Sequence, residues 1–211
     1  MEIPHSIETL DELTSMFHAP GAGAVSKQRD MIDATMAEFV GRCPFLVLAT
    51  TNGDGSVDAS PRGGPPGFVR LLDERHIAIP DLNGNNRLDS YRNIVAHRFA
   101  GVLMIVPGKD DTLRVNGPAT LTTDPDILAG FTEELRTPKL ALVIETAEVY
   151  GHCAKAFRRG LMWQPDKWAE MCAAPDLADM YSRSWGYEPD AVRDDLERSY
   201  AAGLAADRQD T

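Results

Sequence analysis

Cysteine is scarce in this chain, and its thiols are not arranged in pairs. Cys43, Cys153 and Cys172 are scattered over 211 residues without a CxxC motif, which argues against a disulfide framework and against a thiolate zinc site. No apolar stretch approaches the roughly 20 residues of a membrane-spanning helix. The acidic start, MEIPHSIETLDELTSMF, lacks the basic and apolar segments of a secretory signal. We therefore expect a cytoplasmic protein without a metal site.

Positive charge is also in short supply. Lys and Arg number 21 against 32 Asp and Glu, a net charge of −11, which disfavours nucleic acid and anionic membranes as partners. An anionic cofactor can still bind where a few arginines and backbone amides are concentrated locally. The sequence lacks both GxGxxG and GxxxxGK[ST], so a parallel nucleotide-binding sheet is disfavoured.

The length and the 43% hydrophobic content predict one large domain over residues 1–211. We expect N-terminal helices over 1–42, a core over 43–163 and a helical C-terminal extension over 164–211. Segment 83–97 has the apolar spacing of a helix. Strand-like runs separated by turn residues lie at 43–51, from 57 onward, and at 68–72, 76–79, 101–106, 112–122 and 139–150. This order predicts a mainly β fold with α-helices, an antiparallel barrel or sandwich.

The first candidate binding segment is 58–67, DASPRGGPPG, where a strand runs into a loop rich in glycine and proline. Ser60 offers a hydroxyl there, and Arg62 offers a planar guanidinium that suits a phosphate monoester. The alternative is a surface loop in which Arg62 is only solvated.

The second candidate is 83–93, NGNNRLDSYRN, a Gly/Asn loop that leads into a helix. Free amides and the positive end of the helix dipole favour an anion at such a helix start, and Arg87 adds a formal charge. In the alternative, Asn85 or Asn86 is only the N-cap, and Arg87 and Arg92 are solvated. The presence of two phosphate-suited loops in one core favours the anion site.

Other chemistry has less support in the sequence. His152 and Cys153 show no metal-ligand spacing with the other cysteines. Ser60 is not part of the GxSxG motif of a hydrolase nucleophile. His76 and His97 are candidate proton donors only if the fold brings one of them to the site. We therefore assign no catalytic residue.

Three motifs occur in order along the core: SPRGGPPGFV, NxRLDSxxN and TLRVNG. With the residues around them, roughly 44–163, they resemble the pyridoxamine 5′-phosphate oxidase-like flavoproteins, and within these an uncharacterised subgroup with the same motifs. The resemblance implies a six-stranded antiparallel split β-barrel of Greek-key type with peripheral N- and C-terminal helices. It also implies a homodimer with one FMN in each of two clefts at the subunit interface.

Within one subunit, the resemblance assigns two stretches to the cofactor. One is near the flavin phosphate and the isoalloxazine ring, and it comprises Ser60, Arg62, Ile79, Pro80 and Asp81. The other is a second phosphate-binding stretch, and it comprises Asn86, Arg87 and Ser90.

Further contacts are implied by the later motifs. Thr112 matches a polar flavin contact, and Arg114 shares its strand face. A basic segment with Lys155 and Arg158, followed by Trp163, resembles the part of the cleft that comes from the other subunit. In the alternative reading, Thr112 and Arg114 are ordinary surface residues and Trp163 is a core or interface residue.

The end of the chain departs from the family. Pyridoxamine 5′-phosphate oxidase itself closes its substrate site with a C-terminal arginine and histidine, and ERSYAAGLAADRQDT has no such pair. We therefore expect an FMN-dependent oxidoreductase that acts on another, unidentified small molecule. A flavin- or haem-binding sensor or stress protein without turnover is the second hypothesis, and an interaction protein on a vestigial barrel is the third.

Overall fold

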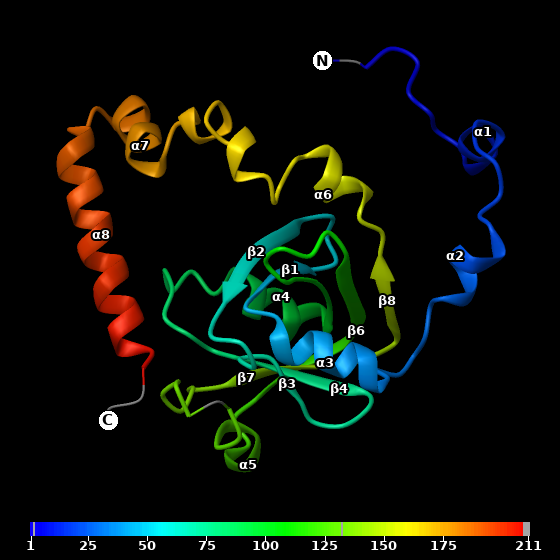
Figure 1. Cartoon of the computed structure of the whole chain (residues 1–211), viewed down its shortest axis with the longest axis horizontal. Coiled ribbons are helices and arrows are strands. Elements are labelled where there is room, and N and C mark those ends of the chain that lie inside the picture. The colour runs from blue at the N-terminus through cyan, green and yellow to red at the C-terminus, as the bar shows by residue number, and fades with distance from the viewer. Residues whose placement is uncertain (2, 132, 209–211) are drawn as a thin grey trace.

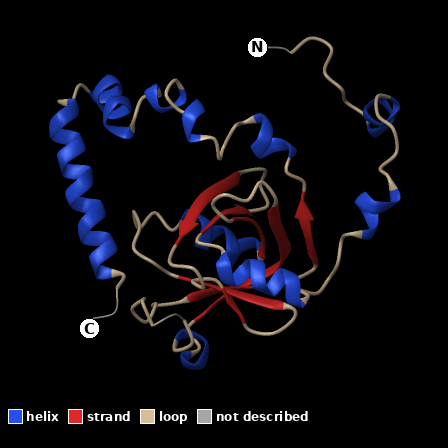
Figure 2. Ribbon diagram, in the orientation of Figure 1, coloured by secondary structure: helices blue, strands red, loops and turns tan. Residues whose placement is uncertain are grey.

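The computed structural model describes residues 1, 3–131 and 133–208. The last three residues of the expected C-terminal extension lie outside this part. Its strands are β1 (Phe45–Thr51), β2 (Val57–Gly63), β3 (Arg70–Leu71), β4 (His76–Pro80), β5 (Phe99–Ile105), β6 (Thr112–Thr122), β7 (Ala141–Glu145) and β8 (Glu148–His152). They form a large antiparallel sheet with helices at both ends of the chain, a mixed α and β architecture (Figure 2).

The strands pair in the order β2-β1-β5-β6-β7-β4-β3. Strand β8 also pairs with β6, along a different part of it from β7. The run expected at 139–150 is therefore two strands, which are separated by Thr146 and Ala147. Strand β7 pairs with the last residues of β6, from Ala119 to Thr122, whereas β8 pairs with its first residues, from Thr112 to Asn116. Strand β6 thereby belongs to both halves of the sheet.

Gly117 lies where β6 passes from one half of the sheet to the other. The corner between β7 and β8 crosses it so closely that a Cβ atom on Gly117 would lie 1.7 Å from the backbone oxygen of Glu145. Ala147 donates its backbone N–H to the carbonyl of Asn116 at 3.0 Å, which holds the corner against β6. A side chain at position 117 is incompatible with this crossing.

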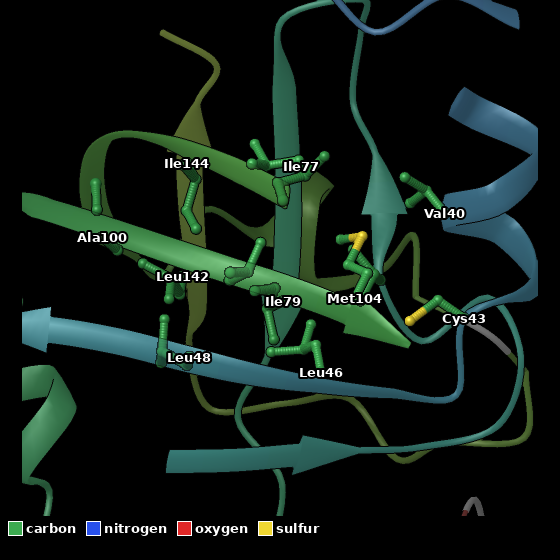
Figure 3. Packing of buried hydrophobic residues seen from close by; sticks show 14 of the residues in the cluster. Val40, Cys43, Leu46, Leu48, Ile77, Ile79, Ala100, Met104, Leu142 and Ile144 are labelled. Carbon is green, nitrogen blue, oxygen red and sulfur yellow. The ribbon is translucent and has the colours of Figure 1, made fainter. Parts of the chain in front are cut away.

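The core lies inside the curved sheet and follows the alternation of the strands. Leu46 and Leu48 of β1 point inward with Met104 of β5, and they meet Ile77 of β4 and Ile144 of β7 (Figure 3). Each of these side chains is almost completely buried. Burial of such a side chain contributes roughly 1.5–3 kcal/mol, so this cluster is the main source of stability.

The helix expected between strands is α4 (Asp89–His97), which packs against β1, β2 and β6. It begins later than the helical spacing from residue 83 predicts. Asn86 and Leu88 adopt left-handed backbone angles, with φ of 56° and 60°, and these angles are incompatible with a right-handed helix. Residues 81–88 therefore form a loop, which we call the 81–88 loop.

The remaining helices lie before β1, between β6 and β7, or after β8. They are α1 (Leu10–Ser15), α2 (Ala22–Ser26), α3 (Ala34–Arg42), α5 (Pro125–Leu128), α6 (Lys155–Arg159), α7 (Leu177–Trp185) and α8 (Pro189–Ala206), with short 3-10 turns at Pro165–Lys167 and Met171–Ala173. Thr9 caps α1 and forms a capping box with Glu12. Among the described residues 1, 3–131 and 133–208, no helix is long and apolar enough to cross a membrane.

The two ends extend away from the sheet in different ways. The N-terminal arm with α1 and α2 reaches outward on one side, and the segment from α6 to α8 arches over the molecule and descends on the other (Figure 1). Neither α1 nor α2 has a buried residue, whereas α7 packs against α8 and the end of α8 returns to the body.

Replacing Gly117 with Ala is expected to destabilise the protein by at least about 3 kcal/mol, because the added Cβ meets backbone atoms that cannot move without separating β6 from β7. Gly41→Ala in α3 is the matched control, since its Cβ would meet nothing within 4 Å and alanine favours the helix by up to about 1 kcal/mol. Urea denaturation followed by circular dichroism compares the two variants. Equal midpoints would contradict the close crossing.

Candidate functional site

A cavity of about 410 Å³ lies between β2, the end of β4, the 81–88 loop and the start of α4. It brings the two candidate segments of the sequence together. The residues expected at the site that line this cavity are Ser60, Arg62, Pro80, Asp81, Asn86, Arg87 and Ser90. Ile79 is adjacent but points into the core, where only 3% of its surface is exposed.

Strand β2 presents one of its faces to the cavity. Asp58, Ser60 and Arg62 alternate with exposed residues, so the three share the half-buried face. The strand continues to Gly63, so Ser60 and Arg62 lie on a strand and not in the loop that the glycines and prolines predict. The regular alternation of a strand is therefore what directs these side chains to one place.

Arg62 is not a solvated surface residue. Its guanidinium donates a hydrogen bond to Oγ of Ser90 at 3.1 Å and lies over the ring of Tyr91, 5.3 Å from the centroid. Its Nε atom is buried and has no hydrogen-bond partner among the residues that the structure describes. An unpaired buried donor costs about 1–3 kcal/mol. Because this atom has almost no exposed surface, an anion in the cavity would reach it only after the guanidinium turned.

Ser90 connects α4 to β2. It is 3% exposed, and its hydroxyl accepts from Arg62 while it donates to Oδ2 of Asp58 at 2.5 Å. Asp58 was missed as a site residue in the sequence, although its spacing of two and four residues from Ser60 and Arg62 indicates the same strand face. The result is a continuous polar row from Asp58 through Ser90 to Arg62.

Tyr91 connects α4 to the end of β4. Its hydroxyl donates to Oδ1 of Asp81 at 3.3 Å, and its ring is buried. Burial raises the pKa of Tyr91 to about 12, against a smaller opposing effect of the Arg62 charge. The sequence offered no signal for this role, since an apolar position on a helix suits an aromatic ring equally well.

The first turn of α4 has no side-chain cap. Leu88 occupies the N-cap position, so neither Asn85 nor Asn86 caps the helix as the alternative reading proposed. Asn85 instead accepts the backbone N–H of Arg87 at 3.1 Å. First-turn amides without a side-chain acceptor are suited to an anion.

The charges around the cavity are mixed. Asp58, Asp81 and Asp89 line it together with Arg62 and Arg87, so three negative groups face two positive ones. Nε of Arg87 is 2.8 Å from Oδ2 of Asp89; the side chain of Arg87 is 72% exposed and that of Asp89 is 42% exposed. Binding of an anion here depends on the direction of individual donors and not on a net positive field.

The other residues expected at the site lie away from this cavity. Arg114 of β6 is 3.2 Å from Glu148 and 3.4 Å from His152, both on β8. Burial, with the charges of Arg114 and Lys27, lowers the pKa of His152. Thr112, on the same strand, is buried and pairs with His152 in the ladder.

The basic segment at α6 forms a third location. Arg158 is 2.9 Å from Asp110, and the indole of Trp163 donates to the carbonyl of Lys109 at 2.8 Å. Lys155 is exposed at the start of the helix. Along with Thr112 and Arg114, these residues do not line the cavity of their own chain, and their part in a site stays a prediction.

Comparison with known proteins places the fold in a family. The family model described as pyridoxamine 5′-phosphate oxidase matches residues 32–153, more than half of the chain. The chain belongs to the pyridoxamine 5′-phosphate oxidase family. The matched region contains β1 to β8 and every residue that lines the cavity. No curated protein matches the sequence.

Several solved structures resemble this chain, at low sequence identity. HupZ of Group A Streptococcus is 16% identical, with 57% of this chain and 94% of that chain covered and a TM-score of 0.47. A conserved hypothetical protein of Mycobacterium tuberculosis is 16% identical, with 63% and 92% covered and a TM-score of 0.45. General Stress Protein 26 of Bacillus anthracis is 15% identical, with 54% and 88% covered and a TM-score of 0.41.

Tyr91 should be a late-titrating phenol among the five tyrosines of the chain. Its folded-state pKa of about 12 lies above the ordinary value near 10, so between these pH values the unfolded chain loses the proton first. The resulting stabilisation is complete below about pH 10 and is lost as the pH rises toward 12. Spectrophotometric titration should show one fewer high-pH phenol in Tyr91→Phe, and an unchanged curve would contradict this environment.

Proposed function

We propose that this chain is an FMN-dependent oxidoreductase that acts on a small molecule other than pyridoxamine phosphate. The observation that carries the proposal is the buried, unpaired Nε of Arg62 beside a cavity in which the two phosphate-suited segments meet. Membership of the pyridoxamine 5′-phosphate oxidase family supports a flavin as the ligand.

The residues around the cavity fit the phosphate end of FMN. The volume of about 410 Å³ lies within the range of small-molecule sites. Arg62, the hydroxyl of Ser90 and the uncapped first turn of α4 would hold the phosphate. The Ser90 hydroxyl now donates to Asp58, so it would exchange this acceptor for the phosphate.

FMN, once bound, would supply the redox chemistry: a reduced donor such as a nicotinamide nucleotide gives up a hydride, and an organic acceptor or oxygen receives the two electrons. The residues of this chain bind and orient the cofactor. Tyr91 keeps its proton at neutral pH. Its ring packs against the Arg62 guanidinium, which lies over it. A second cavity of about 600 Å³ shares Gly63 and Leu82 with the first, and it is where the acceptor would approach.

Flavin binding without turnover is the second candidate. No histidine, cysteine or methionine is among the residues that line the first cavity in the described chain. This supports flavin over haem, because haem iron is usually held by one of these side chains. Asp58, Asp81, Asp89 and Tyr91 do line the cavity, but no reacting atom assigns one of them as a general acid or base. The site is therefore consistent with either turnover by the cofactor alone or simple binding.

The closure of the eight-stranded sheet into a split barrel and the homodimer belong to the same proposal. Thr112, Arg114, Lys155, Arg158 and Trp163 would complete the cleft of a partner subunit, since they do not reach the cavity of their own chain. The N-terminal arm supports an additional contact between subunits. Its exposed apolar side chains are Ile3, Ile7, Leu10, Leu13, Met16, Phe17 and Val25.

Reconstitution with FMN tests the cofactor. The purified protein should be yellow or become so, and Arg62→Ala should weaken FMN binding roughly 10- to 100-fold through the loss of a charge-assisted contact. Arg87→Ala should weaken it less, because Arg87 is exposed and paired with Asp89. Arg92→Ala, on α4 but outside the cavity, is the control. A visible spectrum without flavin after reconstitution would overturn the proposal.

Subunit mixing tests the shared cleft. Sedimentation should give twice the chain mass of 23.1 kDa. Arg62→Ala and Arg114→Ala proteins should each bind FMN poorly, yet a mixture that exchanges subunits should recover about one quarter of the clefts, because a two-fold heterodimer has one intact cleft. A monomer, or no recovery on mixing, would argue against a cleft built from two chains.

A further inference from the structure

The end of α8 returns to the body of the protein at the 81–88 loop. The carboxylate of Asp207 accepts the backbone N–H of Asn83 at 2.9 Å, and it accepts the Asn83 side-chain amide at 2.9 Å. That amide also donates to the carbonyl of Gly203 at 3.2 Å. Asp207 is only 8% exposed. Figure 1 shows α8 descending along one side of the molecule.

Arg136 adds a second connection to the same carboxylate. Its guanidinium is 3.2 Å from Oδ1 of Asp207 and donates to the backbone carbonyl of Asp81 at 3.3 Å. Its backbone N–H donates to the carbonyl of Asp207 at 2.9 Å. Asp207, Asn83 and Arg136 therefore join three segments far apart in the sequence, and we call these residues the C-terminal clasp.

The clasp leads directly to the candidate site. Asp81, which Arg136 contacts through its backbone, accepts the hydroxyl of Tyr91, and the ring of Tyr91 lies beneath Arg62. Asn83 and Asp81 both line the first cavity, and Asp207 lines the second. Two members of the clasp therefore border the two cavities, Asn83 the first and Asp207 the second, and the cavities share Gly63 and Leu82.

We propose that Asp207 is a positioning residue that ties α8 to the 81–88 loop, so that FMN affinity depends on the C-terminal extension. This rests on the proposed function. A buried carboxylate with several donors is costly to remove, because Arg136 and Asn83 would lose their acceptor in a partly buried place. By linkage, a helix that stabilises the loop for FMN is itself stabilised by FMN to the same factor.

The first test needs no cofactor. Hydrogen exchange of the full-length apoprotein should show faster exchange in the 81–88 loop and at the end of α8 in Asp207→Ala, with the sheet unchanged. Asp195→Ala is the matched control, because Asp195 is an exposed aspartate of the same helix that pairs with Arg198 and lies outside the clasp. Asp207→Asn keeps one acceptor and should restore part of the protection. Unchanged loop exchange in Asp207→Ala would overturn the clasp.

The second test measures coupling to FMN. Asp207→Ala should weaken FMN binding on the order of tenfold, within the usual range of coupling between sites, while Asp195→Ala should not change it. FMN should in turn slow exchange at the end of α8 in the wild-type protein. Equal FMN affinity in wild type and Asp207→Ala would overturn the positioning role. If the wild-type protein binds no FMN, the proposed function fails, and the exchange of the apoprotein decides the clasp alone.

Discussion

The close crossing at Gly117 determines how the two halves of the sheet are oriented. Strand β6 pairs with β5, β7 and β8, and it can do so only because the corner after Glu145 passes over a residue without a side chain. The cavity depends on this arrangement. One of its walls, β2, is connected to β6 through β1 and β5, and the opposite wall, at the end of β4, is connected through β7. The two walls therefore take their separation from β6.

Helix α4 then closes the space between these walls with polar contacts. Ser90 binds Asp58 and Arg62 of β2, and Tyr91 binds Asp81 after β4. Because these groups satisfy each other, the cavity has a defined shape without a ligand. Nε of Arg62 is the exception. A donor that is buried, fixed in direction and unpaired is the feature of the site that a phosphate would change most.

An acidic protein can offer an anion site only through such local geometry. The chain carries a net charge of −11, and the carboxylates around the cavity outnumber the guanidiniums. Long-range attraction of an anion is therefore weak. Affinity for an anion would have to come from directed donors in a partly dehydrated place. The 81–88 loop forms part of that place, and the C-terminal clasp contacts this loop at Asn83.

The sequence by itself determined the antiparallel hairpin pattern, the inserted helix, the family and the two segments that line the cavity. These follow from local properties: alternation, turn residues and motif order. Only the tertiary structure decided that 139–150 is two strands, that Arg62 is half-buried with an enclosed Nε, and that Asp58, Tyr91 and Asp207 belong to the surroundings of the site. The sequence also could not tell that Thr112, Arg114 and the α6 residues lie apart from the cavity of this chain. The physical reason is that burial and hydrogen-bond partners arise from segments far apart in the sequence, as between Asn83 and Asp207, and no local pattern encodes which of them meet.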